Sequence, residues 1–120
     1  MNTSKEGQIG EERALSFLEE NGVEVVERNY RLRNGEIDII GWDGDSLVFF
    51  EVKRRRRRGI EDALAAVTKT KQLTICRVSD HYRKKNAISS DTCIRYDVIA
   101  IDDEHTEWYK NAFDYCGRGY

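Results

Sequence analysis

The sequence predicts an α/β fold, more closely an α+β sandwich, in which helices flank a mixed central sheet. A helical pattern opens the chain and three stretches of strand length follow it. A second helical region then separates these strands from two more. The resulting order, α-β-β-β-α-α-β-β, is typical of a sheet covered by helices.

The length and composition favour one soluble domain. The chain has 120 residues, of which 39% are hydrophobic and 35% charged, enough for a core in a single domain over residues 1–120. We expect residues 1–7 and 113–120 to be frayed at its ends. No apolar run is long enough to span a membrane, and the N-terminus is too polar for a signal peptide. We therefore expect a cytoplasmic protein with no membrane partner.

The cysteines do not predict a disulfide framework or a zinc site. Cys76, Cys93 and Cys116 are an odd number and lack the close spacing of metal ligands. Buried or incidental thiols are the better interpretation.

The first helix is expected over residues 9–21. Ala14, Leu15 and Leu18 form its apolar stripe, and Asn21-Gly22 provides a stop signal. Glu11 lies three, four and seven residues before them and so shares their inward face. The alternative is that Glu11 is simply a first-turn acid favoured by the helix dipole.

Strands come next. Residues 23–26 are β-branched and short, and residues 28–35 are interpreted as a polar connection that ends in an Asn-Gly turn. Residues 35–40 and 47–53 then form two apolar strands joined by a hairpin loop.

Three charged residues stand on this hairpin, namely Asp38, Glu51 and Lys53. A charge on a buried strand is costly unless it is paired or holds a metal. Alternation brings all three to one face if the apolar residues of the opposite face share one core. Those apolar residues are Ile37, Ile39, Val48, Phe50 and Val52.

The second half of the chain predicts two helices and two strands. A helix is expected from residue 60 or 61, and another over residues 69–85. The inner face of the latter carries Lys71, Ile75, Val78 and Tyr82, and Gln72 borders it. Strands are expected over residues 93–101 and 106–112.

The charged residues of the hairpin suit phosphodiester hydrolysis. Asp38 and Glu51 offer hard oxygen ligands for Mg²⁺ or Mn²⁺, and Glu11 could add a third carboxylate. Lys53 follows Glu51 on the same face, about 6.6 Å along the strand, where it can stabilise charge on a phosphate. The plainer interpretation is a partly exposed Glu51–Lys53 strand pair with Asp38 as an edge acid.

The combination Asp38…Glu51-Val52-Lys53 resembles the motif of the PD-(D/E)xK nuclease superfamily, although Ile37 replaces the proline. The whole chain resembles the YraN family of small bacterial proteins, whose fold is similar to archaeal Holliday-junction resolvases. The matching segments are Gly7-x-x-Gly10-Glu11-x-x-Ala14, Asn29-Tyr30-Arg31, Gly35-Glu36-Ile37-Asp38-Ile39-Ile40, Leu47-Val48-Phe49-Phe50-Glu51-Val52-Lys53-x-Arg55, Lys71-Gln72 and Arg95-Tyr96-Asp97-Val98.

The resemblance implies a restriction-endonuclease-like fold and a role for each matched residue. Glu11, Asp38 and Glu51 would hold the divalent cation, with Asp38, Glu51 and Lys53 as the catalytic residues. Gln72 would stand beside the site.

The arginine run that follows Lys53 has two interpretations. It can be a solvated loop, or it can bind phosphate at the end of the catalytic strand. In the second case the nucleic-acid-binding residues are Arg54, Arg55, Arg56, Arg57 and Arg58, together with Lys71 and Gln72. No base-reading motif is evident, so we expect recognition of the backbone or of shape.

These observations predict a Mg²⁺- or Mn²⁺-dependent nuclease that hydrolyses DNA, with branched DNA among its candidate substrates. One alternative is a catalytically silent nucleic-acid-binding module. Another is a protein-interaction factor that retains the fold. A homodimer is also expected, because resolvase-like folds act on two strands.

Overall fold

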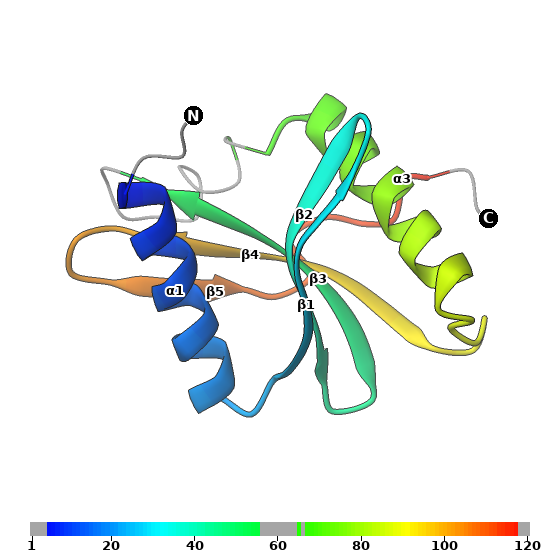
Figure 1. Cartoon of the computed structure of the whole chain (residues 1–120), viewed down its shortest axis with the longest axis horizontal. Coiled ribbons are helices and arrows are strands. Elements are labelled where there is room, and N and C mark those ends of the chain that lie inside the picture. Colours follow the sequence, from blue (N-terminus) through cyan, green and yellow to red (C-terminus); the bar gives the residue numbers. More distant parts are fainter. Residues whose placement is uncertain (1–4, 56–64, 66, 118–120) are drawn as a thin grey trace.

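A sheet held between two helices forms the body of the protein (Figure 1). The computed structural model describes residues 5–55, 65 and 67–117. Helix α1 (Lys5–Glu20) packs on one face of the sheet and helix α3 (Lys69–Lys85) on the other. No helix of the described residues is long and apolar enough to cross a membrane.

The sheet has five strands in the spatial order β1-β2-β3-β4-β5. Their bounds are β1 (Glu24–Leu32), β2 (Gly35–Asp43), β3 (Ser46–Arg54), β4 (Cys93–Ile101) and β5 (Thr106–Tyr109). Strands β3 and β4 run parallel, whereas every other neighbouring pair is antiparallel. A parallel pair needs a long crossover connection, and α3 lies in it. The mixed sheet confirms the predicted α+β class.

Several predicted bounds are confirmed and others are wrong. The helix over residues 69–85 and the strand over residues 93–101 have the bounds expected of them. The helix expected from residue 60 or 61 falls mostly on residues 56–64 and 66, outside the described residues. The polar connection expected over residues 28–35 is instead strand as far as Leu32. Because β1 is an exposed edge strand, it lacks the apolar alternation that marks a half-buried one.

The structure describes residues 5–7 and 113–117 of the two ends that we expected to be frayed. Helix α1 begins at Lys5 rather than at residue 9. At the other end, Phe113 stacks on Tyr96 with the ring centroids 5.2 Å apart. The last strand stops at Tyr109 instead of residue 112, because Asn111 has a left-handed backbone with φ of 54°.

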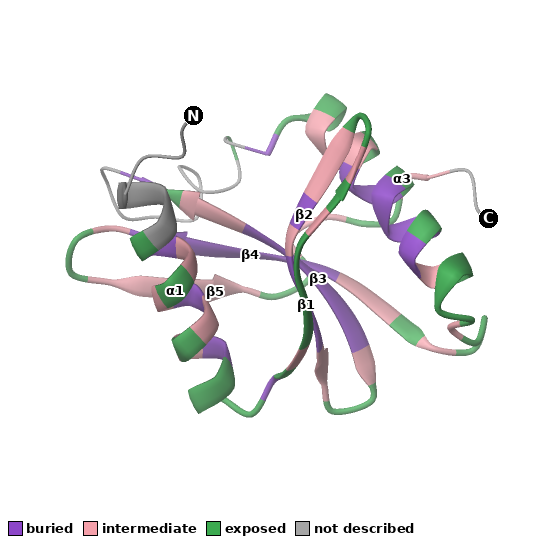
Figure 2. Ribbon diagram, viewed as in Figure 1, coloured by how far each residue is buried: buried purple, intermediate pink, exposed green. Residues whose placement is uncertain are grey.

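Two hydrophobic cores lie on the two faces of the sheet, where the strand centres and the inward faces of the helices are buried (Figure 2). Ile39, Val48 and Phe50 belong to the core under α1. Ile37 belongs to the other core, under α3. The prediction that Ile37 and Ile39 share one face is therefore wrong.

The alternation fails at Asp38. The pairs Arg28↔Ile39 and Tyr30↔Ile37 leave Asn29 opposite Asp38. Asn29 has a φ of 51°, a left-handed conformation that interrupts a regular strand. The side chains of β2 therefore change sides of the sheet at Asp38: Ile37 before it packs under α3, and Ile39 after it packs under α1.

Candidate functional site

The candidate site lies where β2 and β3 part. Their pairing runs from Asp43↔Ser46 to Ile39↔Phe50. Beyond this last pair, the backbone N–H of Val52 donates to Oδ2 of Asp38 over 2.8 Å. The Asp38 carboxylate thus accepts a hydrogen bond from a β3 amide just beyond the last β2–β3 pair. This holds Asp38 at the place where the two strands separate, which we call the opening.

Asp38 is surrounded by other acids. Burial and the charge of Glu51 raise the pKa of Asp38 to about 8, and Glu11 and Glu36 act in the same direction. The hydrogen bond from Val52 lowers the pKa of Asp38, but by less than burial and the neighbouring charges raise it. Asp38 therefore lies close enough to Glu51 and Glu11 for their negative charges to disfavour its ionised form.

A second buried acid shows how this protein satisfies a structural carboxylate. Asp97 on β4 is only 1% exposed, and Arg95 donates to its Oδ2 over 2.8 Å. The Trp108 indole N–H and the Asn111 backbone N–H also donate to it, each over 2.8 Å. Asp97 is thus fully paired, whereas Asp38 has the Val52 amide as its one donor among the described residues.

Glu51 is the buried partner of Asp38 on β3, with a side chain only 5% exposed. The ammonium of Lys71 lies 2.7 Å from its Oε2, and that of Lys53 lies 3.5 Å from the same oxygen. The sequence placed Lys53 on the face of Glu51 to act on a phosphate, and a Glu51–Lys53 pair was its plainer interpretation; the structure contains this pair. The closer contact comes from α3, so two lysines from different elements share one carboxylate.

Lys71 is fixed by the first turn of α3. Thr68 caps this helix, and its side chain accepts a hydrogen bond from the backbone N–H of Lys71. Burial disfavours the Lys71 ammonium, but the hydrogen bond to Glu51 and the charges of Glu51 and Asp38 outweigh it and raise the pKa of Lys71. The sequence placed Lys71 on the inner stripe of its helix with Ile75 and Val78, but it did not identify Glu51 as the group that Lys71 contacts.

The other two expected site residues, Glu11 and Gln72, make no hydrogen bond to Asp38 or Glu51 among the described contacts. Glu11 is half-buried on α1 and acts on Asp38 through its charge. The Gln72 side chain donates to the Val67 carbonyl over 3.1 Å, at the start of its own helix. Among the described residues, no three acids, histidines or cysteines are gathered closely enough to form a ready cation site. The expected set of Glu11, Asp38 and Glu51 is therefore not assembled as a three-ligand group.

The arginines after Lys53 have different environments. Arg55 has a side chain only 2% exposed, with its guanidinium against Glu107 and its Nη1 donating to the Tyr109 hydroxyl over 3.1 Å. It ties the end of β3 to β5, so its side chain is not available to phosphate. Arg54 is exposed and pairs with Asp103 over 2.8 Å. Residues 56–58 lie outside the described residues.

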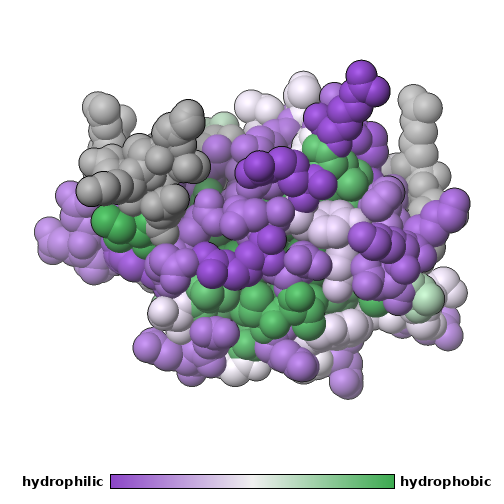
Figure 3. Space-filling model, in the orientation of Figure 1, coloured by the Kyte–Doolittle hydropathy of each residue, from purple (hydrophilic) through white to green (hydrophobic). Residues whose placement is uncertain are grey.

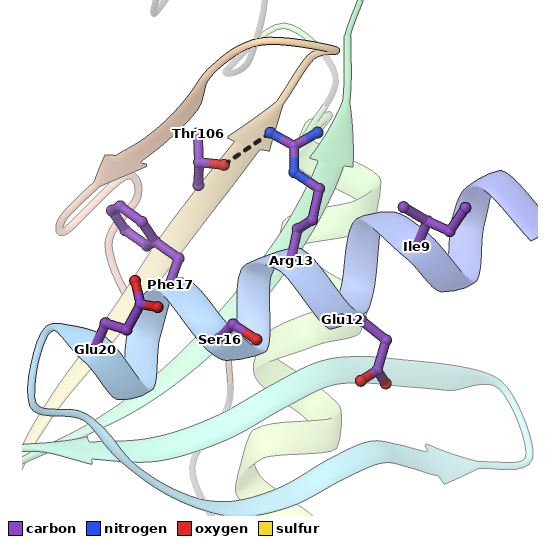
Figure 4. A pocket seen from close by; sticks show the side chains of 7 residues that line it. All are labelled: Ile9, Glu12, Arg13, Ser16, Phe17, Glu20 and Thr106. Atoms are coloured by element: carbon purple, nitrogen blue, oxygen red, sulfur yellow. Dashed lines mark hydrogen bonds between the residues drawn. The ribbon is translucent and has the colours of Figure 1, made fainter.

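A separate hollow of about 740 Å³ lies against the outer surface of α1 (Figure 4). None of the acids or lysines of the candidate site lines it. Among the described residues that line it, the one cationic group is the Arg13 guanidinium, which donates to the Asp102 carbonyl over 2.6 Å and to Thr106 over 3.2 Å. Arg13 therefore fastens the β4–β5 turn to α1.

Comparison with known proteins identifies the family. The model of the Uncharacterised protein family UPF0102 matches residues 10–101. The chain belongs to UPF0102. A UPF0102 protein of Cupriavidus metallidurans is 42% identical over 93% of this chain and 83% of its own length. One from Legionella pneumophila is 41% identical over 93% of this chain and 97% of its own. The UPF0102 match includes every residue of the candidate site and ends before the C-terminal segment.

Proposed function

We propose that this protein is a divalent-cation-dependent nuclease that hydrolyses DNA phosphodiester bonds. The observation that carries the proposal is the acid pair at the opening of β2 and β3. Asp38 is held there against the charges of Glu51 and Glu11, which costs stability unless a cation compensates it. Acids with pKa values perturbed by burial and by a neighbouring carboxylate gather at functional sites.

The carboxylates at the opening have the donor chemistry that suits Mg²⁺ or Mn²⁺, although the described residues do not gather three of them into one group. Asp38 and Glu51 would hold the ion, with Glu11 as the third carboxylate from α1. All three offer the hard oxygen donors that these cations prefer. When bound, the ion would supply Lewis acidity toward a phosphate oxygen and lower the pKa of water.

The two lysines would act on the phosphate itself. The Lys53 side chain is 25% exposed and that of Lys71 is 41% exposed, so both can meet a ligand that enters from solvent. Glu51 already holds both ammonium groups in place, so they need little reorganisation as negative charge develops on the phosphoryl oxygens. Lys53 stabilises that charge from β3, and Lys71 positions the phosphate from α3.

Cationic side chains beside the opening favour a polynucleotide. The tip of the β1–β2 hairpin carries Arg31 and Arg33, and strongly hydrophilic side chains project from it (Figure 3). Arg77 of α3 donates to the Asn34 carbonyl over 2.8 Å and so joins this tip to the helix of Lys71. Lys71 and Arg77 are separated by about 9 Å at 1.5 Å per helical residue. A strand crossing α3 would therefore meet several cations along its backbone.

A second candidate function is a nucleic-acid-binding module without turnover. The contact of 2.7 Å between Lys71 and Glu51 favours it, because the ammonium can compensate the carboxylate in place of a metal ion. In that case the site binds phosphate and does not cleave.

The test is a cleavage panel of single-stranded, duplex, flap and four-way-junction DNA, with and without Mn²⁺. We expect Mn²⁺-dependent cleavage of at least one structure by the wild type. Glu51→Gln should abolish it, and Lys53→Ala should slow it by about 100-fold or more. The matched control is Asp91→Asn, which removes an exposed acid from a loop outside the site.

Two results would contradict the nuclease proposal. One is the absence of cleavage of every structure with either Mn²⁺ or Mg²⁺. The other is cleavage that Glu51→Gln leaves unchanged. DNA binding without cleavage that survives Asp38→Asn would support the second candidate.

A further inference from the structure

Two thiols meet between α3 and the C-terminal segment, residues 111–117. The Sγ atoms of Cys76 and Cys116 lie 3.5 Å apart, and the backbone N–H of Cys116 donates to the Cys76 sulfur over 3.3 Å. Cys76 is fully buried on α3, whereas Cys116 is partly exposed. Each thiol therefore has the other as its neighbour, and solvent reaches the pair from the Cys116 side.

Packing around the thiols holds them in this arrangement. Phe113 and Tyr115 both stack on Tyr96 of β4, with centroid distances of 5.2 and 6.3 Å. The Tyr115 hydroxyl also donates to Asp80 of α3 over 2.9 Å. These contacts dock the residues that directly precede Cys116, so the two sulfurs stay close without a covalent bond.

We propose that Cys76 and Cys116 form a reversible disulfide, a modification site whose oxidant is a peroxide. A disulfide has an S–S distance of about 2.05 Å, so the sulfurs must approach by roughly 1.5 Å. Rotation of the two side chains about their Cα–Cβ bonds supplies a movement of this size.

The chemistry balances in two steps. The Cys116 sulfur attacks one oxygen of hydrogen peroxide, which breaks the O–O bond and gives a sulfenic acid and one water. The Cys76 sulfur then attacks the Cys116 sulfur, and the hydroxyl leaves with the Cys76 proton as a second water. Two thiols are oxidised by two electrons, and one peroxide is reduced.

The relative exposure of the two sulfurs sets the order of these steps. Burial raises the pKa of the Cys76 thiol, so that thiol is the poorer first target for an oxidant. Cys116 is the sulfur that peroxide meets first, and Cys76 resolves the sulfenic acid. The family match includes Cys76 but ends at residue 101, so this pairing depends on the C-terminal segment of this chain.

The bond would have a measurable effect on stability. Cys76 and Cys116 are 40 positions apart, and the closed loop would contain β4 and β5. Closing a loop of that size in the unfolded chain should raise the thermal midpoint by about 10 °C. The bond would also fasten the C-terminal segment to the helix that supplies Lys71.

The experiment oxidises the reduced full chain with equimolar hydrogen peroxide, followed by non-reducing peptide mapping and thermal unfolding. We expect a Cys76–Cys116 crosslinked peptide and a higher midpoint, both reversed by dithiothreitol. Cys93→Ser is the matched control and should behave as the wild type, because Cys93 is exposed at the start of β4. Cys116→Ser should show neither effect while keeping the midpoint of the reduced wild type.

Three outcomes would overturn the proposal. Cys116 could advance to sulfinic acid without a crosslink, or the disulfides could join Cys93 residues of two chains. A crosslink that leaves the midpoint unchanged would also contradict it. Cys76→Ala provides a second variant without the bond, should Cys116→Ser alter the packing of Tyr115.

Discussion

At the scale of single residues, two buried acids differ in how their negative charge is compensated. Asp97 is surrounded by an arginine, an indole N–H and a backbone N–H, so its charge is compensated within the protein. Asp38 accepts from the Val52 amide and faces the charges of Glu51 and Glu11. The first arrangement stabilises the fold, and the second costs stability until a cation arrives.

That cost predicts a pH dependence for the metal-free protein. Burial and Glu51 raise the pKa of Asp38 from 3.8 to about 8, so the folded state binds its proton more tightly than the unfolded state does. The stabilisation is complete below pH 4 and is lost as the pH rises toward 8. Asp38→Asn cannot ionise, so the variant does not lose this stability as the pH rises. We expect the stability advantage of the variant over the wild type to grow by about 3–4 kcal/mol between pH 5 and pH 8.

The measurement is urea unfolding at both pH values, with EDTA present. Asp91→Asn, which alters an exposed loop, serves as the control and should follow the wild type. An advantage of Asp38→Asn that is the same at pH 5 and pH 8 would contradict the account, because it would not come from ionisation.

The burial of Arg55 could not be predicted from a run of identical residues. The five consecutive arginines give no periodicity, so the sequence cannot distinguish a buried side chain from a solvated one. The structure distinguishes them by location, since the Arg55 backbone N–H still pairs with Ile101 and its side chain turns to Glu107 and Tyr109. Arg54, one residue earlier, is exposed.

At the scale of elements, the β1–β2 hairpin is the part that positions the site. Its tip lies against α3, and Asn29 twists the ribbon opposite Asp38. The sequence predicted strands here but misjudged the length of β1 and the face of Ile37. Period-two alternation holds only within a regular ladder, and a left-handed residue ends that regularity. The helix α3 was predictable in full, because its apolar stripe runs unbroken from Ile75 to Tyr82.

The close packing of the hairpin on α3 predicts the effect of filling Gly35. A Cβ atom there would lie 2.6 Å from Cγ2 of Thr74 and 2.8 Å from Cγ2 of Val78. Gly35→Ala should therefore lower the free energy of unfolding by about 1–3 kcal/mol, as measured by urea denaturation.

Gly10→Ala is the matched control for this substitution. A Cβ atom at Gly10 has no neighbour within 4 Å, and the residue lies inside α1. Because alanine favours a helix, this variant should gain up to about 1 kcal/mol. If Gly35→Ala were as stable as Gly10→Ala, the hairpin could not be packed on α3 as described.

At the scale of the whole molecule, the fold brings two helices from opposite faces to one opening in the sheet. Glu11 acts on Asp38 from α1, while Lys71 contacts Glu51 from α3. The sequence could name the acids of β2 and β3, because charges on apolar strands stand out. It could not pair Lys71 with Glu51, because that contact depends on how α3 crosses the sheet.

The C-terminal segment is a second part of the molecule whose packing could not be predicted from the sequence. The sequence offers no periodic pattern over residues 113–120, which we expected to be frayed. Residues 113–117 dock through Phe113, Tyr115 and the Cys116 thiol. Side-chain stacking on a β4 tyrosine, rather than strand or helix formation, orders this segment, and single-sequence patterns do not detect such contacts.

The most direct test of the central claim is the binding of Mn²⁺ to the protein without DNA, measured by isothermal titration calorimetry. The account predicts that the wild type and Asp91→Asn bind Mn²⁺ equally. Asp38→Asn, which keeps the shape of the side chain but removes a ligand charge, should bind at least 10-fold more weakly. Equal binding by Asp38→Asn, or no binding by the wild type, would contradict the assignment of this acid pair to a cation.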